Sequence, residues 1–455
     1  MSAPSLRLID IGLYERAMPF THPFRFGAAT VREAPQAFVQ ATVEVEGIGR
    51  ASGATAEMMM PKWFDKDPAK SPDENIADLR RSLTDARAAY LASRDGDSAF
   101  GHHARAIATL APDPSPPLVR QYGPAVIDKA ILDALFRAVG VDAATGLRRN
   151  LAGIDSRLTP DLGQAAIDGF LAGIRPGAAI ALRWTVGLID DLDVLARTVE
   201  EDGLRYLKIK LGGDVDADLD RLATIARLLD GKTFHATLDA NEQYDPDRLV
   251  RLAEALQSEA RLEGIRRRLL YIEQPFDRRS TPATPLGRAG EAFAFIIDEA
   301  DDSYDAFPRA LEQGYRGVSS KSCKGLYKAI LNAARCRASG GGRFMAAEDL
   351  TCQAGLAVQQ DTALAAMLGC DHVERNGHHY VDGFGPAPRA EAERFRLSHP
   401  DLYRDADGIR LDARDGSLRI ASLFAGPGLA GGASPDWPSL AGMDVAAPLL
   451  ERSSS

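Results

Sequence analysis

Residues 204–241 read LRYLKIKLGGDVDADLDRLATIARLLDGKTFHATLDAN, in which two strand patterns enclose one helix pattern. Alternate residues of a strand lie on the same face, so the first strand pattern places Lys208 and Lys210 together on one face. The helix pattern repeats its apolar residues at helical spacing and is expected to end at Gly231. A helix between two strands is the repeating unit of α/β proteins, so this stretch predicts that class of fold. Two ammonium groups on one face of an otherwise apolar strand need an explanation.

The same alternation continues on both sides of this stretch. Eight strand patterns alternate with helical patterns, at residues 179–187, 204–213, 234–241, 269–276, 294–300, 316–322, 343–349 and 371–377. Eight consecutive strands joined by helices predict a closed parallel barrel, a TIM-like (β/α)7β barrel. An open, doubly wound sheet is the alternative, but the glycine-rich turn that binds dinucleotides in such sheets is missing.

The two ends of the chain have a different pattern. Residues 5–20 and 36–49 alternate apolar and polar residues like the strands of an antiparallel sheet, and helical patterns follow them. Residues 407–422 predict a short hairpin in a tail rich in glycine and proline. We therefore expect two domains, an α+β capping domain at 1–165 plus 386–455 and a catalytic barrel at 166–385.

Composition argues against several classes of protein. The net charge of −10 and the lack of a basic stripe argue against a nucleic-acid partner. No run of about 18 apolar residues is present, and the first residues lack a secretory signal, so we expect a cytoplasmic protein without a membrane partner. Four well-separated cysteines are typical of reduced thiols; they are Cys323, Cys336, Cys352 and Cys370. We expect a small-molecule substrate and a homo-oligomer.

Charged residues stand at the carboxyl ends of the predicted strands, where parallel barrels form their active sites. In strand order they are Lys208 and Lys210, Asp239, Glu273, Asp298 beside Glu299, Lys321, and Glu348 beside Asp349. Asp239, Glu273 and Asp298 follow three consecutive strands, and three carboxylates in one low-dielectric mouth repel one another unless protons or a cation neutralise them. Oxygen ligands without His or Cys point to Mg²⁺, with Mn²⁺ as the alternative, and disfavour zinc.

Counting strands also places the lysines relative to one another. The strands that carry Lys210 and Lys321 are four apart in a ring of eight, so the two lysines are expected on opposite walls. A substrate held beside the acids would then meet one lysine on each face. This arrangement suits an enzyme that removes a proton from one face and returns a proton to the other.

Five short motifs follow one another along the predicted barrel. They are KIK at 208–210, LDAN at 238–241, IEQP at 272–275, IDEA at 297–300 and the sixth-strand lysine, Lys321. Together they resemble the enolase superfamily in its muconate lactonizing enzyme-like branch, the mandelate racemase/muconate lactonizing enzyme family. The resemblance extends to the expected cap at 125–140 and to the tail, at DGSLRI (415–420) and GPGL (426–429).

The resemblance implies a Mg²⁺ site with the ligands Asp239, Glu273 and Asp298. It implies an enzyme that abstracts a proton α to a carboxylate and passes through an enediolate intermediate. Lys210 and Lys321 would be the acid/base residues. Lys208 would contact the substrate carboxylate, and its charge is expected to keep Lys210 neutral enough to act as a base. Asn241 and Glu299 resemble groups that support the metal ligands.

Two kinds of reaction use this intermediate. Racemisation or epimerisation uses both lysines and is the function that we expect first. A lyase, dehydratase or cycloisomerase needs one base and one acid. A barrel that binds a ligand without catalysis is the third hypothesis, and the full set of polar strand ends disfavours it.

Neighbouring charged residues leave alternatives at two strand ends. Adjacent strand residues face opposite ways, and the motif favours Asp298 over Glu299 as the ligand. Lys321 falls at the end of its strand pattern, whereas Lys324 opens the following helix, which favours Lys321 as the acid/base residue.

Two further groups of residues near the last strands remain open. Glu348 and Asp349 either bind a substrate amine or cap the following helix. His372, His378 and His379 either touch the substrate or have structural roles in and around the eighth strand.

Two loops of the expected cap, at 22–30 and 51–67, would close over the mouth and select the substrate, as the resemblance implies. The second contains the bulky segment MMMPKWF (58–64), which either packs within the cap or lines the site with apolar groups. Arg25 in the first loop is a candidate to bind a distal anion. Dipeptide epimerases of the family carry a D-x-D motif on the eighth strand, whereas residues 372–383 read HVERNGHHYVDG, which disfavours dipeptide substrates.

Overall fold

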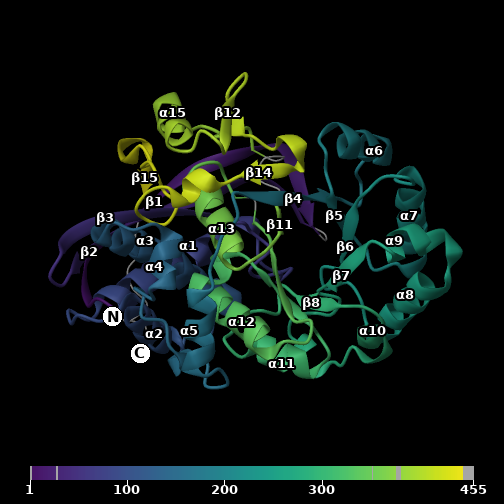
Figure 1. Ribbon diagram of the computed structural model, residues 1–455, viewed down its shortest axis with the longest axis horizontal. Coiled ribbons are helices and arrows are strands. Elements are labelled where there is room, and N and C mark those ends of the chain that lie inside the picture. The colour runs from purple at the N-terminus through teal and green to yellow at the C-terminus, as the bar shows by residue number, and fades with distance from the viewer. Residues whose placement is uncertain (1–2, 27–28, 351, 376–380, 444–455) are drawn as a thin grey trace.

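The computed structural model describes residues 3–26, 29–350, 352–375 and 381–443. Eight parallel strands form one ring, in which each strand pairs with its neighbours in the sequence. They are β4 (Ala179–Val186), β5 (Tyr206–Lys210), β6 (His235–Asp239), β7 (Leu269–Glu273), β8 (Phe295–Ile297), β9 (Gly317–Ser320), β10 (Phe344–Ala347) and β11 (His372–Glu374). The last strand pairs with the first, with Val373 opposite Leu182, and this pairing closes the ring (Figure 1). The predicted barrel is confirmed, and the open sheet is excluded.

Helices surround the barrel strands (Figure 1). They are α6 (Leu192–Glu201), α7 (Val215–Leu228), α8 (Pro246–Ser258), α9 (Glu263–Arg266), α10 (Gly287–Ala292), α11 (Ala306–Glu312), α12 (Leu326–Ser339) and α13 (Leu356–Met367). The start of α8 shows why these segments are helical, because the Asp245 side chain accepts a hydrogen bond from the Arg248 amide and Pro246 occupies the first turn. Within the described ranges, no helix combines the length and the apolar character that crossing a membrane requires.

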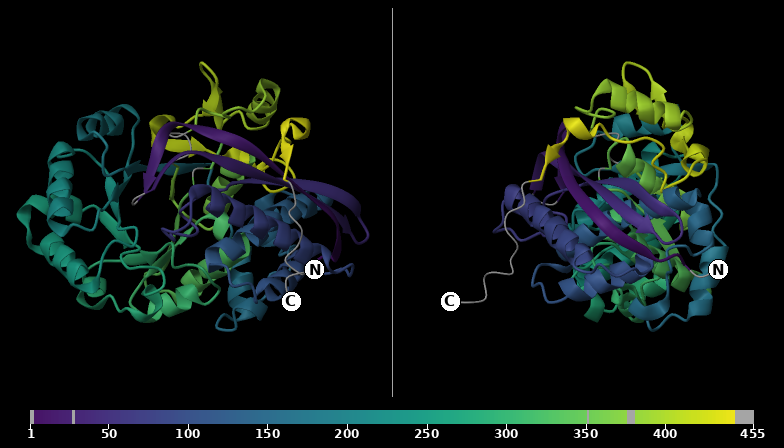
Figure 2. Two further views of the ribbon diagram at one scale, coloured as in Figure 1. Left: turned by 180° about the vertical axis from the view of Figure 1, so that it is seen from behind. Right: turned by 90° about the vertical axis from the view of Figure 1, so that its left-hand side faces the viewer.

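An antiparallel sheet in the order β15, β1, β2, β3 forms the cap. Its strands are β1 (Leu6–Phe26), β2 (Ala29–Val45), β3 (Gly49–Met58) and β15 (Ala441–Gly442). β15 comes from the C-terminal part of the chain and pairs with β1, with Tyr14 opposite Gly442, so both ends of the chain contribute to the cap as predicted (Figure 2). The cap helices are α1 (Pro72–Leu91), α2 (Ala99–Leu110), α3 (Pro117–Val139), α4 (Ala143–Arg148) and α5 (Gln164–Ala172). The residues at which one domain ends and the other begins stay a prediction.

The hairpin predicted at 407–422 is wrong. Its first half, β13 (Ile409–Leu411), pairs with the preceding strand β12 (Tyr403–Asp405), and its second half, β14 (Ser417–Arg419), pairs with barrel strand β4. Ala181 pairs with both β11 and β14, so these strands lie on opposite edges of β4. On the β14 edge, β5 reaches β4 only from Arg183 onward, which leaves the start of β4 free to pair with β14. The tail therefore extends the barrel sheet, and local alternation did not reveal this distant partner.

One buried ion pair fixes the cap to the barrel. Lys129 of α3 donates a hydrogen bond to Glu57 Oε2 of β3 at 2.8 Å, and the Ser322 hydroxyl donates to the same oxygen at 2.7 Å. Burial disfavours the charge of Lys129, but the Glu57 carboxylate outweighs burial and raises the lysine pKa, so the pair is ionic. Because Ser322 directly follows Lys321, the pair joins the cap to a strand end that carries a predicted acid/base residue.

We expect Lys129→Met to lower the free energy of unfolding by about 3–5 kcal/mol, since it leaves the Glu57 carboxylate buried without a cation. The double variant Lys129→Met/Glu57→Gln is expected to recover part of this loss. Urea denaturation followed by circular dichroism measures both effects. Lys232→Met, which breaks a surface pair with Glu200, is the matched control and should cost less than about 1 kcal/mol. Equal losses for Lys129→Met and this control would contradict the prediction.

Candidate active site and metal centre

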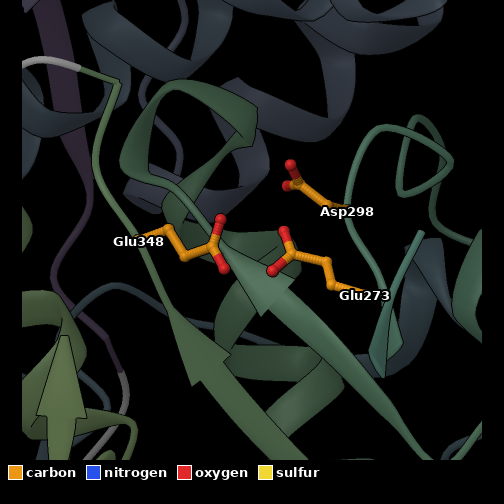
Figure 3. A group of neighbouring side chains, drawn as sticks. All are labelled: Glu273, Asp298 and Glu348. Atoms are coloured by element: carbon orange, nitrogen blue, oxygen red, sulfur yellow. The ribbon is translucent and has the colours of Figure 1, made fainter. Parts of the chain in front are cut away.

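Three carboxylates from three strands meet at the mouth of the barrel. Glu273 is the last residue of β7, and Asp298 and Glu348 directly follow β8 and β10. One oxygen atom from each residue lies within 4.8 Å of the others, and all three side chains are buried. Figure 3 shows the three side chains pointing toward one another. This group is able to hold a divalent cation.

Asp239, which the sequence also predicts as a metal ligand, is engaged by the two lysines of β5. It is the last residue of β6, and its Oδ2 atom accepts a hydrogen bond from Lys210 Nζ at 2.6 Å and lies 2.9 Å from Lys208 Nζ. The described group of converging acids therefore contains Glu348 in the place expected for Asp239. A direct bond from Asp239 to the cation stays a prediction.

Lys208 lies at the centre of the acids. Its Nζ atom is 2.9 Å from Asp239, 3.1 Å from Glu273, and 2.8 Å from both Glu348 and Glu374. Burial disfavours the ammonium form, but the surrounding carboxylates outweigh burial and raise the pKa of Lys208 well above its ordinary value. The surroundings of Lys208 therefore favour its ammonium form, which neutralises part of the acidic charge.

Lys210 and Lys321 lie on opposite sides of the barrel, as predicted, because three strands separate β5 from β9 in either direction around the ring. Lys321 Nζ donates to Asp298 at 2.6 Å and to Glu348 at 2.7 Å. Lys210 Nζ donates to Asp239 and, at 2.9 Å, to the amide oxygen of Asn241.

The surroundings of Lys321 stabilise its charged form. Burial opposes that charge, yet Asp298 and Glu348 raise the pKa of Lys321 well above its ordinary value. The competing residue Lys324 has a different role. Its Nζ atom donates to the Ser319 carbonyl at 2.6 Å and to the Asp298 carboxylate at 3.1 Å. These two hydrogen bonds position the Asp298 carboxylate.

Glu273 differs from the other acids of the group. Burial, followed by the charges of Asp239 and Glu348, raises the pKa of Glu273 well above its ordinary value. Burial acts in the same direction on Asp298 and Glu348, but neighbouring ammonium groups outweigh it and lower the pKa of both acids. The Glu273 Oε2 atom is buried and lies 3.1 Å from Lys208 Nζ, without the geometry of a hydrogen bond. A carboxylate oxygen held only by this ion pair, among further carboxylates, fits a hard divalent cation such as Mg²⁺ or Mn²⁺.

Asn241 and Glu299 lie beside the strand-end acids, where the sequence places them. The backbone N–H of Asn241 donates a hydrogen bond to Asp239 Oδ1 at 3.0 Å, and the side-chain nitrogen of Asn241 lies 3.5 Å from Glu299 Oε1. The cap reaches the same position, because Lys66 Nζ lies 3.4 Å from Glu299 and forms an ion pair with Glu242. Glu299 thus faces the cap, while Asp298 faces the converging acids.

Two charged residues that the sequence did not indicate, Arg183 and Glu374, also belong to the group of ion pairs at the barrel mouth. Arg183 of β4 is fully buried and lies 3.0 Å from Glu348, and Glu374 ends β11 and contacts Lys208. A signal was present, since Arg183 is the only charged residue in its strand pattern, AIALRWTVG. It stands in mid-strand, whereas active-site residues of parallel barrels are expected at the strand ends.

The sequence left two roles open for the residues near the last strands, and the structure bears on each of them. Helix α13 has Gly355 at its N-cap and no side-chain cap, so Glu348 and Asp349 do not cap it. Asp349 lies 3.7 Å from the Arg375 guanidinium. His372 is the first residue of the short strand β11, which ends at Glu374. Its Nδ1 atom accepts a hydrogen bond from the Arg183 guanidinium at 2.6 Å, and this contact favours a structural role for the histidine. His378 and His379 lie outside the described residues, as does the side chain of Arg25.

The cap segment 58–64 combines both roles that the sequence left open. Met58, Met59 and Met60 are fully buried, and Phe64 packs edge-on against Trp63 and Tyr122 within the cap. The Trp63 ring also lies over Lys321, with 5.1 Å between the ring centroid and Nζ. An aromatic face of this kind attracts a cation and excludes water from the lysine.

Comparisons with known proteins agree with this geometry. A family model described as "Enolase C-terminal domain-like" matches residues 191–429. A search of curated proteins gave no match. Among solved structures, the L-Ala-D/L-Glu epimerase from Bacillus subtilis is similar with a TM-score of 0.63 and 15% identity, covering 93% of this chain and 98% of that chain.

Two other solved structures have the same fold. The muconate lactonizing enzyme from Pseudomonas fluorescens has a TM-score of 0.62 and 18% identity, covering 95% of this chain and 97% of that chain. A dipeptide epimerase from Enterococcus faecalis V583, complexed with Mg and the dipeptide L-Leu-L-Tyr, has a TM-score of 0.62 and 16% identity, covering 93% and 99%. The family model spans more than half of the chain, and the barrel mouth holds a buried group of three acids, Glu273, Asp298 and Glu348. The chain therefore belongs to the enolase superfamily, as an enzyme with the C-terminal domain of the mandelate racemase/muconate lactonizing enzyme family.

Proposed function

We propose that this enzyme abstracts a proton α to the carboxylate of a small-molecule substrate, in a Mg²⁺-dependent reaction through an enediolate, and that it is a racemase or epimerase. The observation that carries the proposal is the pair of lysines on opposite strands. Lys210 and Lys321 stand at the ends of opposite strands of the ring, and Glu273 and Asp298 stand on strands between them. This geometry allows one lysine to take a proton from one face of a substrate while the other lysine delivers a proton to the opposite face.

The donor set supports a hard cation at the acids. When bound, a divalent cation would hold the substrate carboxylate and stabilise the negative charge that develops on its oxygen atoms. We propose Glu273 and Asp298 as two of its ligands and Asp239 as the third, with Glu348 as the competing third ligand. The dipeptide epimerases from Methylococcus capsulatus and Cytophaga hutchinsonii are both solved in complex with Mg, which supports Mg²⁺ over Mn²⁺.

The partners of the two lysines suggest different resting states. Lys321 is held between two carboxylates, Asp298 and Glu348, and both stabilise its ammonium form. Lys210 has one carboxylate partner, Asp239, and one uncharged partner, Asn241. We therefore propose that Lys321 begins the cycle as the proton donor and Lys210 as the base. Lys208 would remain charged throughout, because the acids around it hold its proton.

Elimination or cycloisomerisation through the same intermediate is the second candidate. The muconate lactonizing enzyme from Pseudomonas fluorescens, solved with muconolactone, shares the fold. A lyase or cycloisomerase needs one base and one acid, so Lys210 or Lys321 alone would abstract the proton. A dipeptide substrate remains disfavoured by the missing D-x-D motif, although several relatives are solved with dipeptides.

Substitution of single acids by amides is expected to show whether Asp239 or Glu348 is the third ligand of the cation. Glu273→Gln should weaken Mg²⁺ binding by at least about 10- to 100-fold, the range known for supporting residues of metal sites. Asp239→Asn is expected to match this loss, while Glu348→Gln should have a smaller effect. Isothermal titration calorimetry with Mg²⁺ measures all three, and Glu200→Gln on the surface is the matched control. A large loss for Glu348→Gln with none for Asp239→Asn would exchange their roles.

The affinity for Mg²⁺ is expected to fall as the pH is lowered from about 8 to about 5. The pKa of Glu273 is raised above its ordinary value, so a proton competes with the cation for this carboxylate at a higher pH than for an exposed glutamate. Titration calorimetry at several pH values measures the trend. In Glu273→Gln the dependence should become flatter. A Mg²⁺ affinity that stays constant over this range would contradict the proposed role of Glu273.

Proton exchange tests the roles of the lysines. In D₂O with Mg²⁺, a library of carboxylates that includes N-acyl amino acids and sugar acids is expected to contain substrates whose α-proton exchanges, as followed by ¹H NMR. Lys210→Ala and Lys321→Ala should each lower exchange by about 100-fold or more, the contribution of one acid/base group. Lys232→Ala should leave the rate unchanged. Exchange that persists in both active-site variants would rule out this mechanism, and product analysis divides racemisation from elimination.

A further inference from the structure

A second cavity lies at the opposite end of the barrel from the acids, and we call it the basal cavity. It has a volume of about 600 Å³ and is lined by the early residues of three strands, Leu270 and Tyr271 of β7, Phe344 and Met345 of β10, and His372 of β11. The ends of α5, α12 and α13 close its sides, and α5 lies beside α12 (Figure 1). Its size is in the range of sites for small organic ligands, about 300–1,000 Å³.

The inner wall of the basal cavity is apolar. Phe170, Ile174, Leu270, Phe344 and Met345 are among the side chains that form it. Two thiols, Cys336 and Cys370, also face it, and burial raises the pKa of each to about 12. Both thiols are therefore uncharged at neutral pH and add to the apolar wall. A ligand with an apolar body would bury that body here.

The rim of the basal cavity is cationic. Arg175, Arg337 and Arg343 line it, against a single acid, Asp371. Arg175 donates to the Ala172 and Ile174 carbonyls at 2.9 and 2.7 Å, and Arg343 donates to the Ser339 hydroxyl. Among the described residues, none of the three guanidinium groups forms an ion pair.

The Arg337 guanidinium lies close to the turn at Gly173. A Cβ atom added at Gly173 would lie 2.0 Å from Arg337 Nη1, so the guanidinium occupies the space that the missing side chain leaves. A planar guanidinium with free N–H groups is the usual partner of a carboxylate.

Tyr271 closes the inner end of the basal cavity. Its side chain is only 3% exposed, it lines the cavity, and its ring packs against Phe344 with 5.5 Å between centroids. Its hydroxyl is buried and makes no hydrogen bond to any described residue. Buried hydroxyl groups normally have a partner, because an unsatisfied one destabilises the fold. The ring, and not the hydroxyl, is therefore the part of Tyr271 that a ligand in the cavity would touch.

We propose that the basal cavity is a binding site for a small organic monocarboxylate with an apolar alkyl or aryl body. The apolar body lies against Phe344, Met345 and the Tyr271 ring, and the carboxylate pairs with Arg337 and Arg343 at the rim. Asp371 at the rim disfavours a dianion such as inorganic phosphate. The site is separate from the acids of the mouth and does not rest on the proposed catalytic function.

Displacement of a fluorescent probe tests this proposal. The aryl sulfonate 1-anilinonaphthalene-8-sulfonate is expected to bind one molecule per folded chain, and 4-phenylbutyrate should displace it, whereas inorganic phosphate and 4-phenylbutylamine should not. EDTA is present throughout, so that the mouth acids hold no metal. Arg337→Glu is expected to weaken both ligands by about tenfold or more, the loss of a charge-assisted hydrogen bond. Arg309→Glu, at an exposed arginine of α11, is the matched control and should bind like the wild type.

Two further variants distinguish this site from the mouth and from a structural effect. Glu273→Gln should leave 4-phenylbutyrate binding unchanged. Tyr271→Phe should raise the thermal midpoint of the free protein, because it removes an unsatisfied hydroxyl, and should leave 4-phenylbutyrate binding unchanged, because the ring that lines the cavity stays in place. Loss of binding in Glu273→Gln with none in Arg337→Glu would place the ligand at the mouth and overturn the proposal. Wild-type binding in both Arg337→Glu and Arg343→Glu would overturn it as well.

Discussion

The contacts of Lys208 with four carboxylates are the interaction on which the rest of the site depends. Without a buried cation, Asp239, Glu273, Glu348 and Glu374 would repel one another in a low-dielectric interior, and some of them would have to be protonated. Lys208 neutralises part of this negative charge. Lys321 and Arg183, which come from other strands, neutralise a further part of it. The repulsion that remains falls on Glu273, whose pKa is raised by burial and by the charges of Asp239 and Glu348, and a divalent cation at this position would take the place of its proton.

The cap strengthens these interactions by enclosing them. Trp63 lies over Lys321, Lys66 reaches Glu299, and the buried pair of Lys129 and Glu57 fixes the cap beside Ser322. Each contact removes water from the mouth, and electrostatic interactions are stronger in a medium of lower dielectric constant. A cap segment that carries both an aromatic ring and an ammonium group thus lies against the charged groups of the mouth.

The barrel interior also connects its two ends. Arg183 lies between His372, near the basal cavity, and Glu348, in the group of converging acids. A charged side chain at this depth is held by its partners on both sides, since a buried guanidinium without them would be costly. The same residue therefore positions a carboxylate of the mouth and separates the mouth from the cavity at the other end of the barrel.

The sequence by itself determined the barrel, the order of its strands, the cap built from both ends, and the side chains that stand at the strand ends. These features follow from local periodicity and from counting, because the side chains of a strand alternate and parallel strands end at one edge. Only the tertiary structure decided that Glu348 joins Glu273 and Asp298, that Lys208 and Lys210 engage Asp239, and that β14 pairs with β4. Each of these outcomes depends on the reach of side chains or free backbone groups across the ring, between residues far apart in the chain, and local pattern carries no information about that distance.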